Sequence, residues 1–233
     1  ADQEYATQLC RAVEPLGIRW SGQGSLTMAK NPELLYWLKR SGCDVLLIGI
    51  ESLDEDNLRQ MNKSWSIRMG ERDELIRRIH DAGISIYATF VFGFDADTPD
   101  TINGAVGFAE KHGFYFSAFN HVTPFPATPL YRKLKDEGRL ITEKWWMDTA
   151  YRYGYLPFHP RKMSYEDLSA ACKNARKEFF KFSSIMRRGA LLLSRNRNPV
   201  LSYLFLSSNL MLQREVEQRM ELPIGINLDE LPK

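Results

Sequence analysis

Short apolar runs alternate along the chain with segments that have the period of an α-helix. The runs cover residues 18–20, 43–50, 84–92 and 114–122. An unbroken apolar run is typical of a strand that is buried on both faces, and strands separated by helices of roughly ten or more residues are typical of parallel βαβ units. The pattern therefore predicts four parallel strands with helices packed around them.

Glycine and proline mark where the predicted helices end and begin. A glycine stands directly before each apolar run, where a left-handed residue ends a helix most easily. These glycines are Gly17, Gly42, Gly83 and Gly113. Three helix starts place an N-cap residue before a proline that suits the first helical position. They are Asn31-Pro32, Thr98-Pro99 and Thr128-Pro129.

Four strand–helix units in series indicate an α/β fold, namely a (β/α) TIM-type barrel or part of one, because parallel strands must be covered by helices. A doubly wound open sheet is the competing architecture. No G-x-G-x-x-G motif follows any of the strands, which counts against a dinucleotide-binding version of that sheet. We expect the barrel over residues 1–138, an aromatic-rich wrap and helical extension over residues 139–222, and a loosely ordered tail over residues 223–233.

The predicted extension contains a long helix and an uncharged segment. Ser164 begins the helix with a capping-box-like signature, and the helix runs to about residue 181. Residues 199–212 carry no charged side chain and are preceded by Arg187, Arg188, Arg195 and Arg197. This uncharged segment is shorter than the ~20 residues that a membrane-spanning helix needs. It is either a helix docked on the barrel, the commoner use of such runs, or a basic-flanked helix that touches a lipid surface.

The composition narrows the functional classes. Hydrophobic residues make up 44% and charged residues 26% of the 233 positions, which is ordinary for a globular protein. The net charge of +2 is too small for a nucleic-acid-binding protein, which needs a concentrated basic face. Cys10, Cys43 and Cys172 lie far apart, so a disulfide framework is not expected. The sequence shows no secretory signal, which favours the cytoplasm, and because it opens with Ala1 we expect it to be a piece of a longer protein.

Polar and small residues follow each predicted strand, at residues 21–25, 51–52, 93–98 and 123–128. Because the carboxyl ends of parallel strands meet at one face of a barrel, these residues predict a site at that face. Glu51 directly follows the continuous apolar run that ends at Ile50 and is thereby placed at the mouth of the barrel. The alternative is that Glu51 caps the next helix or pairs with Lys63.

The sequence lacks the common metal and hydrolase motifs. The four histidines show no ligand spacing and no Cys-x-x-Cys occurs, so a zinc site is not expected. Neither a G-x-S-x-G elbow nor a Walker sequence is present. His121 ends the fourth predicted strand, where it either faces the mouth or is a hydrogen-bonded histidine of the wall.

Several motifs, taken in order, resemble those of the radical S-adenosylmethionine enzymes. They are Gly49-Ile50-Glu51-Ser52, then Leu58, Asn62 and Lys63, then Phe92-Gly93-Phe94-Asp95-x-Asp97-Thr98, then Thr123-Pro124-Phe125-Pro126-x-Thr128-Pro129-Leu130-Tyr131, then Gly138-Arg139, and finally Met163-Ser164. The resemblance runs from about residue 9 to about residue 188. It is closest to the branch whose members often carry an N-terminal cobalamin-binding domain, commonly labelled Fe–S oxidoreductases.

The resemblance implies a partial barrel of six strands, of which this chain holds the third to the sixth. In such enzymes a [4Fe–4S] cluster on a Cys-x-x-x-Cys-x-x-Cys loop binds S-adenosylmethionine and cleaves it reductively to methionine and a 5′-deoxyadenosyl radical, which abstracts hydrogen from a substrate. Relatives that bind cobalamin often methylate unactivated carbons. The three cysteines of this chain cannot form that loop. We therefore expect the cluster and any cobalamin domain upstream of Ala1, and we expect the chain alone to be inactive.

The same resemblance assigns residues to S-adenosylmethionine. Glu51 falls near the ribose or the amino group, where a carboxylate accepts hydrogen bonds from hydroxyls or an ammonium. Phe92 and Gly93 fall where relatives back the adenine with an apolar side chain and close backbone. Backbone groups of Val122 and Thr123 fall at the adenine edge.

Further contacts and partners follow from the resemblance. Gln23 and Ser25, at the end of the first strand of this chain, are polar groups near the ribose or the carboxylate. A small-molecule substrate of unknown identity would lie over the same mouth, against His121 and Phe125. The other partners are the upstream part of the same protein and a reductant protein. The sheet edge next to the missing strands would be covered by the N-terminal helix or by a second copy of the chain.

Two other functional classes remain open at this point. A cofactor-free aldolase-type barrel enzyme would need a lysine or an acid–base pair inside the mouth, whereas Lys30 and Lys63 fall on predicted loops or helices. A non-catalytic barrel module would present a surface to a partner or to lipid, the latter through residues 187–212. Three closely spaced cysteines in the upstream sequence would separate the radical enzyme from both.

Overall fold

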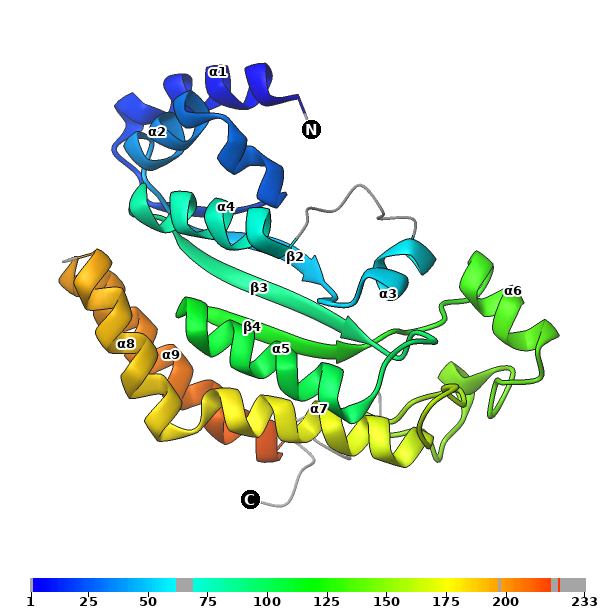
Figure 1. The fold of residues 1–233 in the computed structure, drawn as a ribbon. Coiled ribbons are helices and arrows are strands. Elements are labelled where there is room, and N and C mark those ends of the chain that lie inside the picture. The colour runs from blue at the N-terminus through cyan, green and yellow to red at the C-terminus, as the bar shows by residue number, and fades with distance from the viewer. Residues whose placement is uncertain (1, 62–68, 197, 219–221, 223–233) are drawn as a thin grey trace.

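The computed structural model describes residues 2–61, 69–196, 198–218 and 222. Within them, four strands form one parallel sheet in the order β1-β2-β3-β4. The strands are β1 Trp20–Gly24, β2 Cys43–Glu51, β3 Ser85–Phe92 and β4 Phe116–His121. Each strand is joined to the next by a crossover that carries at least one helix (Figure 1). The predicted α/β class, a partial (β/α) barrel with a helical extension, is confirmed.

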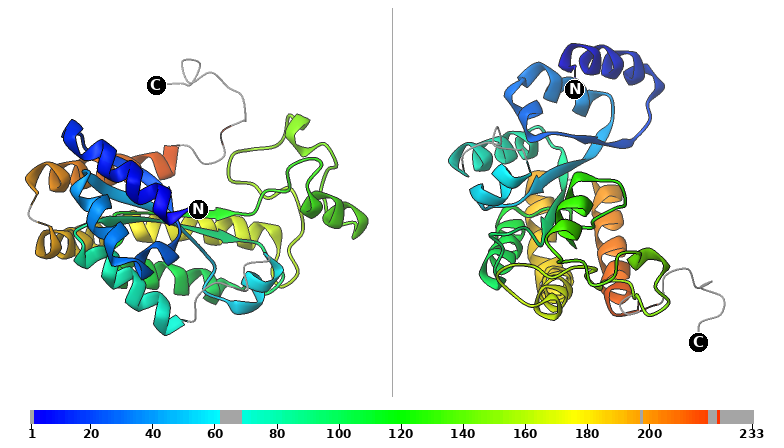
Figure 2. Two further views of the ribbon diagram at one scale, coloured as in Figure 1. Left: turned by 90° about the horizontal axis from the view of Figure 1, so that it is seen from above. Right: turned by 90° about the vertical axis from the view of Figure 1, so that its right-hand side faces the viewer.

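Helices pack on the sheet and beside its β4 edge. They are α1 Gln3–Val13, α2 Pro32–Arg40, α3 Glu55–Gln60, α4 Met69–Asp81, α5 Pro99–His112, α6 Pro129–Asp136, α7 Tyr165–Phe180, α8 Phe182–Arg195 and α9 Pro199–Gln218. Short 3₁₀ helices cover Glu14–Leu16, Leu26–Lys30 and Trp145–Met147. Helices α2, α4, α5 and α7 contact strands of the sheet, and α1 packs on α2 at the β1 side of the molecule (Figure 2).

The backbone confirms the helix ends that the sequence predicts. The four glycines before the apolar runs all have left-handed φ angles, 62° at Gly17, 96° at Gly42, 76° at Gly83 and 65° at Gly113. The N-caps accept a hydrogen bond from the backbone N–H three residues further on. They are Asn31, Thr98, Thr128 and Ser164.

The first strand differs from its prediction. The apolar pattern predicts a strand at residues 18–20 followed by a polar loop, whereas β1 spans Trp20–Gly24. Its residues show no apolar period, because β1 is an edge strand of the described sheet and alternates between half-buried and exposed positions. Gln23 therefore lies within β1, and Ser25 directly follows it.

The two faces of the sheet have different environments. The outer face packs into the apolar core, where Ile48 and Phe90 are completely buried. The inner face carries the alternate residues, and among them Gln23, Gly49 and Asn120 are exposed. Because β2 is paired on both sides, the exposure of Gly49 shows that the inner face itself is open.

Helices α7, α8 and α9 flank β4, the strand at the other edge of the sheet. Arg188 of α8 is fully buried and donates to the carbonyl oxygens of Phe114 at 3.1 Å and Tyr115 at 3.3 Å, just before β4. Arg176 of α7 donates from Nε to the carbonyl oxygen of Phe119 at 3.0 Å. Side chains of the helical extension thus reach the backbone of a strand that has no further strand beside it within the described residues.

The uncharged segment forms most of α9, and its predicted docking is confirmed. Leu201 and Phe205 of α9 are buried in a cluster with residues of α8 and with Tyr115. No helix of the described residues is long and apolar enough to cross a membrane. Some predictions concern positions outside the described residues, namely Asn62, Lys63, Arg197 and residues 223–233.

Candidate functional site

The carboxyl ends of the four strands lie at one end of the sheet, because all four strands run in the same direction (Figure 1). Ser25 follows β1, Glu51 ends β2, Gly93 follows β3 and Thr123 comes two residues after β4. These positions belong to neighbouring strands in the order of the sheet. We call this end of the sheet the mouth.

Glu51 has an unusual backbone conformation. Its φ is +66°, in the left-handed region that residues other than glycine rarely adopt, and the pairing of β2 with β3 shifts register between Gly49 and Glu51. A Cβ atom at Gly49 would lie 2.5 Å from Oε1 of Glu51, so the carboxylate lies against the glycine of its own strand. Backbone strain of this kind is concentrated at functional sites.

The sequence left two alternative roles for Glu51, namely capping the next helix and pairing with Lys63. The N-cap of the following helix α3 is Asp54, whose carboxylate accepts from the backbone N–H groups of Asp56 at 2.9 Å and Asn57 at 3.0 Å. Glu51 is therefore not the cap, and that alternative is wrong. The pairing with Lys63 involves a residue outside the described part of the chain.

The loop after β3 is held by Asp97. This side chain is 2% exposed, and its Oδ2 accepts from the N–H groups of Gly93 at 2.7 Å and Phe94 at 3.0 Å. Its Oδ1 accepts from Nδ2 of Asn57 at 2.7 Å, and Oδ1 of Asn57 in turn accepts from the N–H of Ala96 at 3.1 Å. Burial raises the pKa of Asp97, against the opposing effect of the two backbone donors.

Gly93 needs to be glycine for two reasons. Its φ is +108°, and a Cβ atom there would lie 3.1 to 3.2 Å from side-chain atoms of Phe158, Leu168 and Val122. The backbone of the loop is thus packed closely against α7 and the segment before it. Asp97 belongs to the sequence motif around Gly93 but was given no role there, and Asn57 was missed because nothing in the sequence links two residues 40 positions apart.

Asp95 ties the segments around the mouth to one another. Its carboxylate accepts from Nε2 of Gln60 on α3 at 3.0 Å and from NH1 of Arg139 at 3.0 Å. It also forms ion pairs with Lys133 of α6 at 3.2 Å and with Arg161 at 3.2 Å. Burial acts to raise the pKa of Asp95, but the hydrogen bonds from Lys133 and Arg139 outweigh it and the pKa is lowered.

The remaining residues assigned to S-adenosylmethionine lie in different surroundings. Gln23 is exposed on the inner face, and Ser25 places its hydroxyl 2.7 Å from that of Thr27. The side chain of Phe92 is buried in the core and stacked with Phe90 at 6.4 Å between ring centroids, so it is not available at the mouth.

Val122 and Thr123 are half-buried at the end of β4. The backbone N–H of Val122 donates to the carbonyl oxygen of Phe92 at 2.7 Å, so it is already used inside the protein. The carbonyl oxygen of Thr123 accepts from the N–H of Phe125 at 3.0 Å, which shapes the turn that leads away from the strand.

The two predicted substrate residues, His121 and Phe125, lie in different environments. His121 alternates with the exposed Asn120 along β4, and its Nδ1 lies 3.4 Å from the carbonyl oxygen of Val122. Burial of the ring lowers the pKa of His121 to about 4, so the imidazole is neutral at pH 7. Phe125 is 62% exposed, with its ring centroid 6.5 Å from that of Trp145.

The cysteines do not fit an iron–sulfur cluster. Cys10 lies on α1, Cys43 begins β2 and Cys172 lies on α7, and all three are buried and free. Burial raises the pKa of Cys43 and of Cys172 to about 12, whereas cluster ligands are thiolates. The described residues also contain no group of three or more His, Cys, Asp or Glu side chains that could hold a metal ion.

Similar proteins were found among curated sequences, while no protein-family model matches the chain. The bacteriochlorophyllide d C-12(1)-methyltransferase of Chlorobaculum tepidum is 33% identical over 185 residues, which are 79% of this chain and 39% of that protein. The hopanoid C-2 methylase of Rhodopseudomonas palustris is 31% identical over 119 residues, 51% of this chain and 22% of that protein. The chain thus spans well under half the length of these relatives.

Two solved structures share the fold. The cobalamin-dependent S-adenosylmethionine radical enzyme OxsB, with aqua-cobalamin bound, superposes with a TM-score of 0.54 and 14% identity over 92% of this chain and 37% of its own. The radical S-adenosylmethionine methyltransferase TsrM from Kitasatospora setae, with cobalamin and a [4Fe–4S] cluster bound, has a TM-score of 0.52 and 14% identity over 92% of this chain and 49% of its own.

Proposed function

Because the chain belongs to the radical S-adenosylmethionine superfamily, in the branch whose members often carry a cobalamin-binding domain, we propose that it is the C-terminal part of a methyltransferase of this branch. When bound, a [4Fe–4S] cluster supplies the electron that splits S-adenosylmethionine into methionine and a 5′-deoxyadenosyl radical, and cobalamin carries a methyl group. The cysteines of this chain do not fit the cluster. The proposal therefore assigns the cluster and cobalamin to the upstream part of the same protein.

The observation that carries the proposal is the geometry of Glu51. Its carboxylate ends a central strand, lies against a glycine and stands beside an inner face that is open. In the proposed site it accepts hydrogen bonds from the ribose hydroxyls or the ammonium group of S-adenosylmethionine. A hydrogen bond to a charged group is worth about 1.5–3 kcal/mol, so one such contact has a measurable effect on affinity.

The backbone at the end of β3 forms the second part of the proposed site. Gly93 has no side chain, so a flat group such as adenine approaches the main chain closely there. Asp97 and Asn57 act as positioning residues, because they fix the loop through hydrogen bonds without facing the ligand. In this proposal Val122 and Thr123 border the adenine, and Gln23 and Ser25 supply polar groups to the ribose or the carboxylate.

The relatives suggest the type of reaction. The curated names describe methyl transfer to carbon positions of a bacteriochlorophyllide and of a hopanoid. For this chain we propose the same class of reaction, namely methylation at a carbon of a small molecule. A reductant protein would supply the electrons.

The test uses the full-length protein loaded with its cluster. We expect Glu51→Gln to weaken S-adenosylmethionine binding roughly tenfold or more in isothermal titration calorimetry, because the amide keeps the shape of the side chain and removes its charge. The matched control is Glu55→Gln, which changes an exposed carboxylate of α3 that pairs with Arg59. An affinity equal to that of the control would remove Glu51 from the site and with it the main support for the proposal.

A further inference from the structure

Helices α8 and α9 form a hairpin next to β4, and only one side of each helix is used to dock it (Figure 1). Ile185 and Leu192 of α8 and Leu201 and Phe205 of α9 are buried, and they pack together with Tyr115. The hairpin nevertheless holds eight of the 19 large apolar side chains that are exposed among the described residues. Single exposed apolar side chains are normal, but a contiguous group of them marks an interaction surface.

The exposed apolar residues of α8 lie on the side of this helix toward α9. Phe182, Met186 and Leu193 are each at least half exposed, and their spacing of four and seven residues places them on one face. Gly189 belongs to the same face, three residues after Met186. A Cβ atom at Gly189 would lie 3.3 Å from the ring of Phe205 on α9. The exposed face of α8 therefore borders the contact between the two helices.

The exposed apolar residues of α9 lie on the side of this helix toward α8. Val200, Tyr203 and Leu206 are exposed and follow one another at intervals of three residues. Leu210, four residues after Leu206, packs against the buried cluster that includes residues of α8. The exposed apolar side chains of the two helices thus border the same contact. We call them the hairpin face, which consists of Phe182, Met186, Leu193, Val200, Tyr203 and Leu206.

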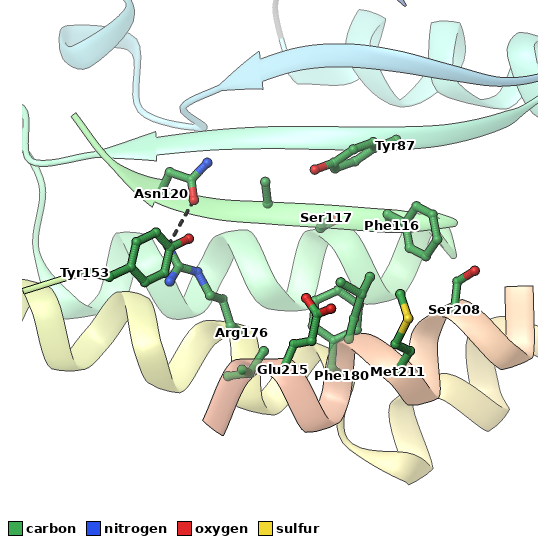
Figure 3. Close-up of a pocket in the computed structure, with 13 residues that line it drawn as sticks. Tyr87, Phe116, Ser117, Asn120, Tyr153, Arg176, Phe180, Ser208, Met211 and Glu215 are labelled. Carbon is green, nitrogen blue, oxygen red and sulfur yellow. Dashed lines mark hydrogen bonds between the residues drawn. The ribbon is translucent and has the colours of Figure 1, made fainter. Parts of the chain in front are cut away.

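Another side of α9 faces the sheet. Ser208, Met211 and Glu215 of α9 border the space between this helix and β4 (Figure 3). Ser208 follows Leu206 by two residues, which is slightly more than half a turn of an α-helix. The hairpin face is therefore directed away from the inner face of the sheet and does not belong to the proposed cofactor site.

The charges of the hairpin sequence have one sign. Residues 182–214 contain five arginines and no acidic residue, whereas the rest of the chain contains more acidic than basic side chains. Arg188 is buried and Arg195 is bonded to a histidine of α4, so these two arginines serve the fold.

Two arginines of the hairpin are exposed. Arg187 of α8 pairs with Glu110, and its side chain is 59% exposed. Arg214 of α9 is exposed and lies on the same side of the helix as Tyr203, eleven residues further on. The long stem of an arginine covers apolar surface while its charged end stays in a polar environment. The hairpin face therefore combines apolar side chains with cations.

This combination matches the surface of a membrane that contains anionic lipids. Anionic headgroups attract arginine, and the boundary between headgroups and acyl chains takes up apolar side chains. The ring of Tyr203 is apolar with a polar tip, which suits such a boundary. A second copy of the hairpin matches less well, because a two-fold contact places a surface against itself and would bring arginines near arginines.

We propose that the hairpin face binds the surface of a membrane that carries anionic lipids. Its apolar side chains enter the boundary between headgroups and acyl chains, and Arg187 and Arg214 contact the lipid phosphates. The contact is made at the surface, since the other sides of α8 and α9 are packed on the protein. The proposal does not depend on the proposed cofactor site.

The experiment is flotation of the 233-residue chain with vesicles of phosphatidylcholine, with and without about 30% phosphatidylglycerol. We expect the chain to partition into the anionic vesicles at least about fivefold more strongly than into the neutral ones, and more weakly in about 0.5 M sodium chloride. Tyr203→Glu places a charge in the hairpin face and should lower the partition at least about tenfold. The matched control is Tyr36→Glu, the same change at an exposed tyrosine of α2, which should float like the parent.

Two further variants test the charge and the insertion separately. Arg214→Gln should weaken partition into anionic vesicles about three- to fivefold, while Arg40→Gln, at an exposed arginine of α2, should not. Leu206→Cys labelled with the fluorophore NBD should show a blue-shifted emission on anionic vesicles, and Tyr36→Cys labelled in the same way should not. The native cysteines are buried, which keeps the label at the introduced site.

Several outcomes would overturn the proposal. One is no flotation with anionic vesicles, and another is equal flotation of Tyr203→Glu and Tyr36→Glu. Flotation of the 233-residue chain but not of the full-length protein would show that the upstream part covers the hairpin face. A dimer in sedimentation velocity that Tyr203→Glu converts to a monomer would show that a second copy covers it. Circular dichroism checks the fold, and if Tyr203→Glu does not fold, the labelled Leu206→Cys decides alone.

Discussion

The edge of the sheet at β4 and the mouth are both places where strands stop making backbone pairs. The two places differ in what lies against the unpaired backbone. At β4, the flanking helices bring buried donors to backbone carbonyls, and Arg188 alone donates to those of Phe114, Tyr115 and Phe179. At the mouth, the backbone is held in left-handed conformations at Glu51 and Gly93, and the inner face beside it is open.

The two regions differ in what they contribute to stability. Burying a guanidinium is favourable only when its donors are satisfied, and Arg188 also contacts Oδ1 of Asn209 and lies 3.8 Å from the ring centroid of Phe179. Left-handed backbone at a residue such as Glu51 costs about 1–3 kcal/mol. The β4 edge therefore contributes to stability, whereas the left-handed backbone at Glu51 costs stability, as is expected if the mouth is the proposed cofactor site.

The largest effect on stability is expected at the β4 edge. Arg188→Met keeps the length of the side chain and removes every donor, so the carbonyl oxygens of Phe114 and Phe179 lose a partner in a region closed to water. We expect the free energy of unfolding to fall by about 3–5 kcal/mol. Urea denaturation followed by circular dichroism measures this change.

The neighbouring arginine provides the control. Arg187 is 59% exposed and pairs with the half-buried carboxylate of Glu110, so water still screens the arginine and the pair should contribute less than the buried donors of Arg188. Arg187→Met should therefore change stability far less than Arg188→Met. If the two variants were equally stable, the buried donors would not be what secures this edge, and the comparison between edge and mouth would fail.

The second effect is a pH dependence in the helices of the same edge. Arg195 of α8 donates to Nδ1 of His80 on α4 at 2.9 Å and to the carbonyl oxygen of His112 at 2.8 Å, which fastens α8 to the helices on the outer side of the sheet. Burial, and then the charges of Arg195 and His112, lower the pKa of His80 to about 3. The imidazole is neutral in the folded protein and accepts the hydrogen bond.

The sign of the pH effect follows from the lowered pKa. The unfolded chain takes up a proton at His80 near pH 6.5, while the folded protein does so only near pH 3. The contribution to stability is complete above pH 6.5 and decreases by about 1.4 kcal/mol for each pH unit below it, or roughly 2 kcal/mol at pH 5. His80→Gln keeps an acceptor for Arg195 and should lose about this much less stability between pH 7 and pH 5. Urea midpoints that fall equally in both proteins would show that His80 does not titrate in this way.

Local features of the fold could be predicted from the sequence because their causes lie within a few residues. The N-caps at Asn31 and Thr98 and the left-handed glycines at Gly42 and Gly113 depend only on neighbouring backbone. The strand β2 could be predicted because both of its faces are apolar over most of its length. The parallel order of the sheet then follows from the lengths of the crossovers.

Features that depend on distant contacts could not be predicted. Strand β1 has a polar sequence because one of its edges is unpaired within the described residues, so no apolar pattern marks it. Arg188 looks like one of several surface arginines, and most of its buried partners, among them Phe114 and Phe179, lie 9 to 74 positions away. The side chain of Phe92 packs into the core, and Asn57 donates a hydrogen bond to Asp97. Both features depend on contacts between residues that are distant in the sequence.

The smallest effect on stability is expected for Gly49→Ala at the mouth, although this variant should bind S-adenosylmethionine much more weakly. A Cβ atom at this position would lie 2.5 Å from Oε1 of Glu51, which is the end of a flexible side chain and can move aside. The free energy of unfolding should therefore change by no more than about 1 kcal/mol. The displaced carboxylate should nevertheless weaken the binding of S-adenosylmethionine roughly tenfold in the full-length, cluster-loaded protein. Gly107→Ala on α5, with nothing within 4 Å of the added atom, is the control and should raise stability by up to about 1 kcal/mol without affecting binding. Calorimetry and urea denaturation are carried out on the parent protein, Gly49→Ala and Gly107→Ala. If Gly49→Ala lost stability as well as affinity, the mouth would also support the fold, and the comparison between edge and mouth would fail.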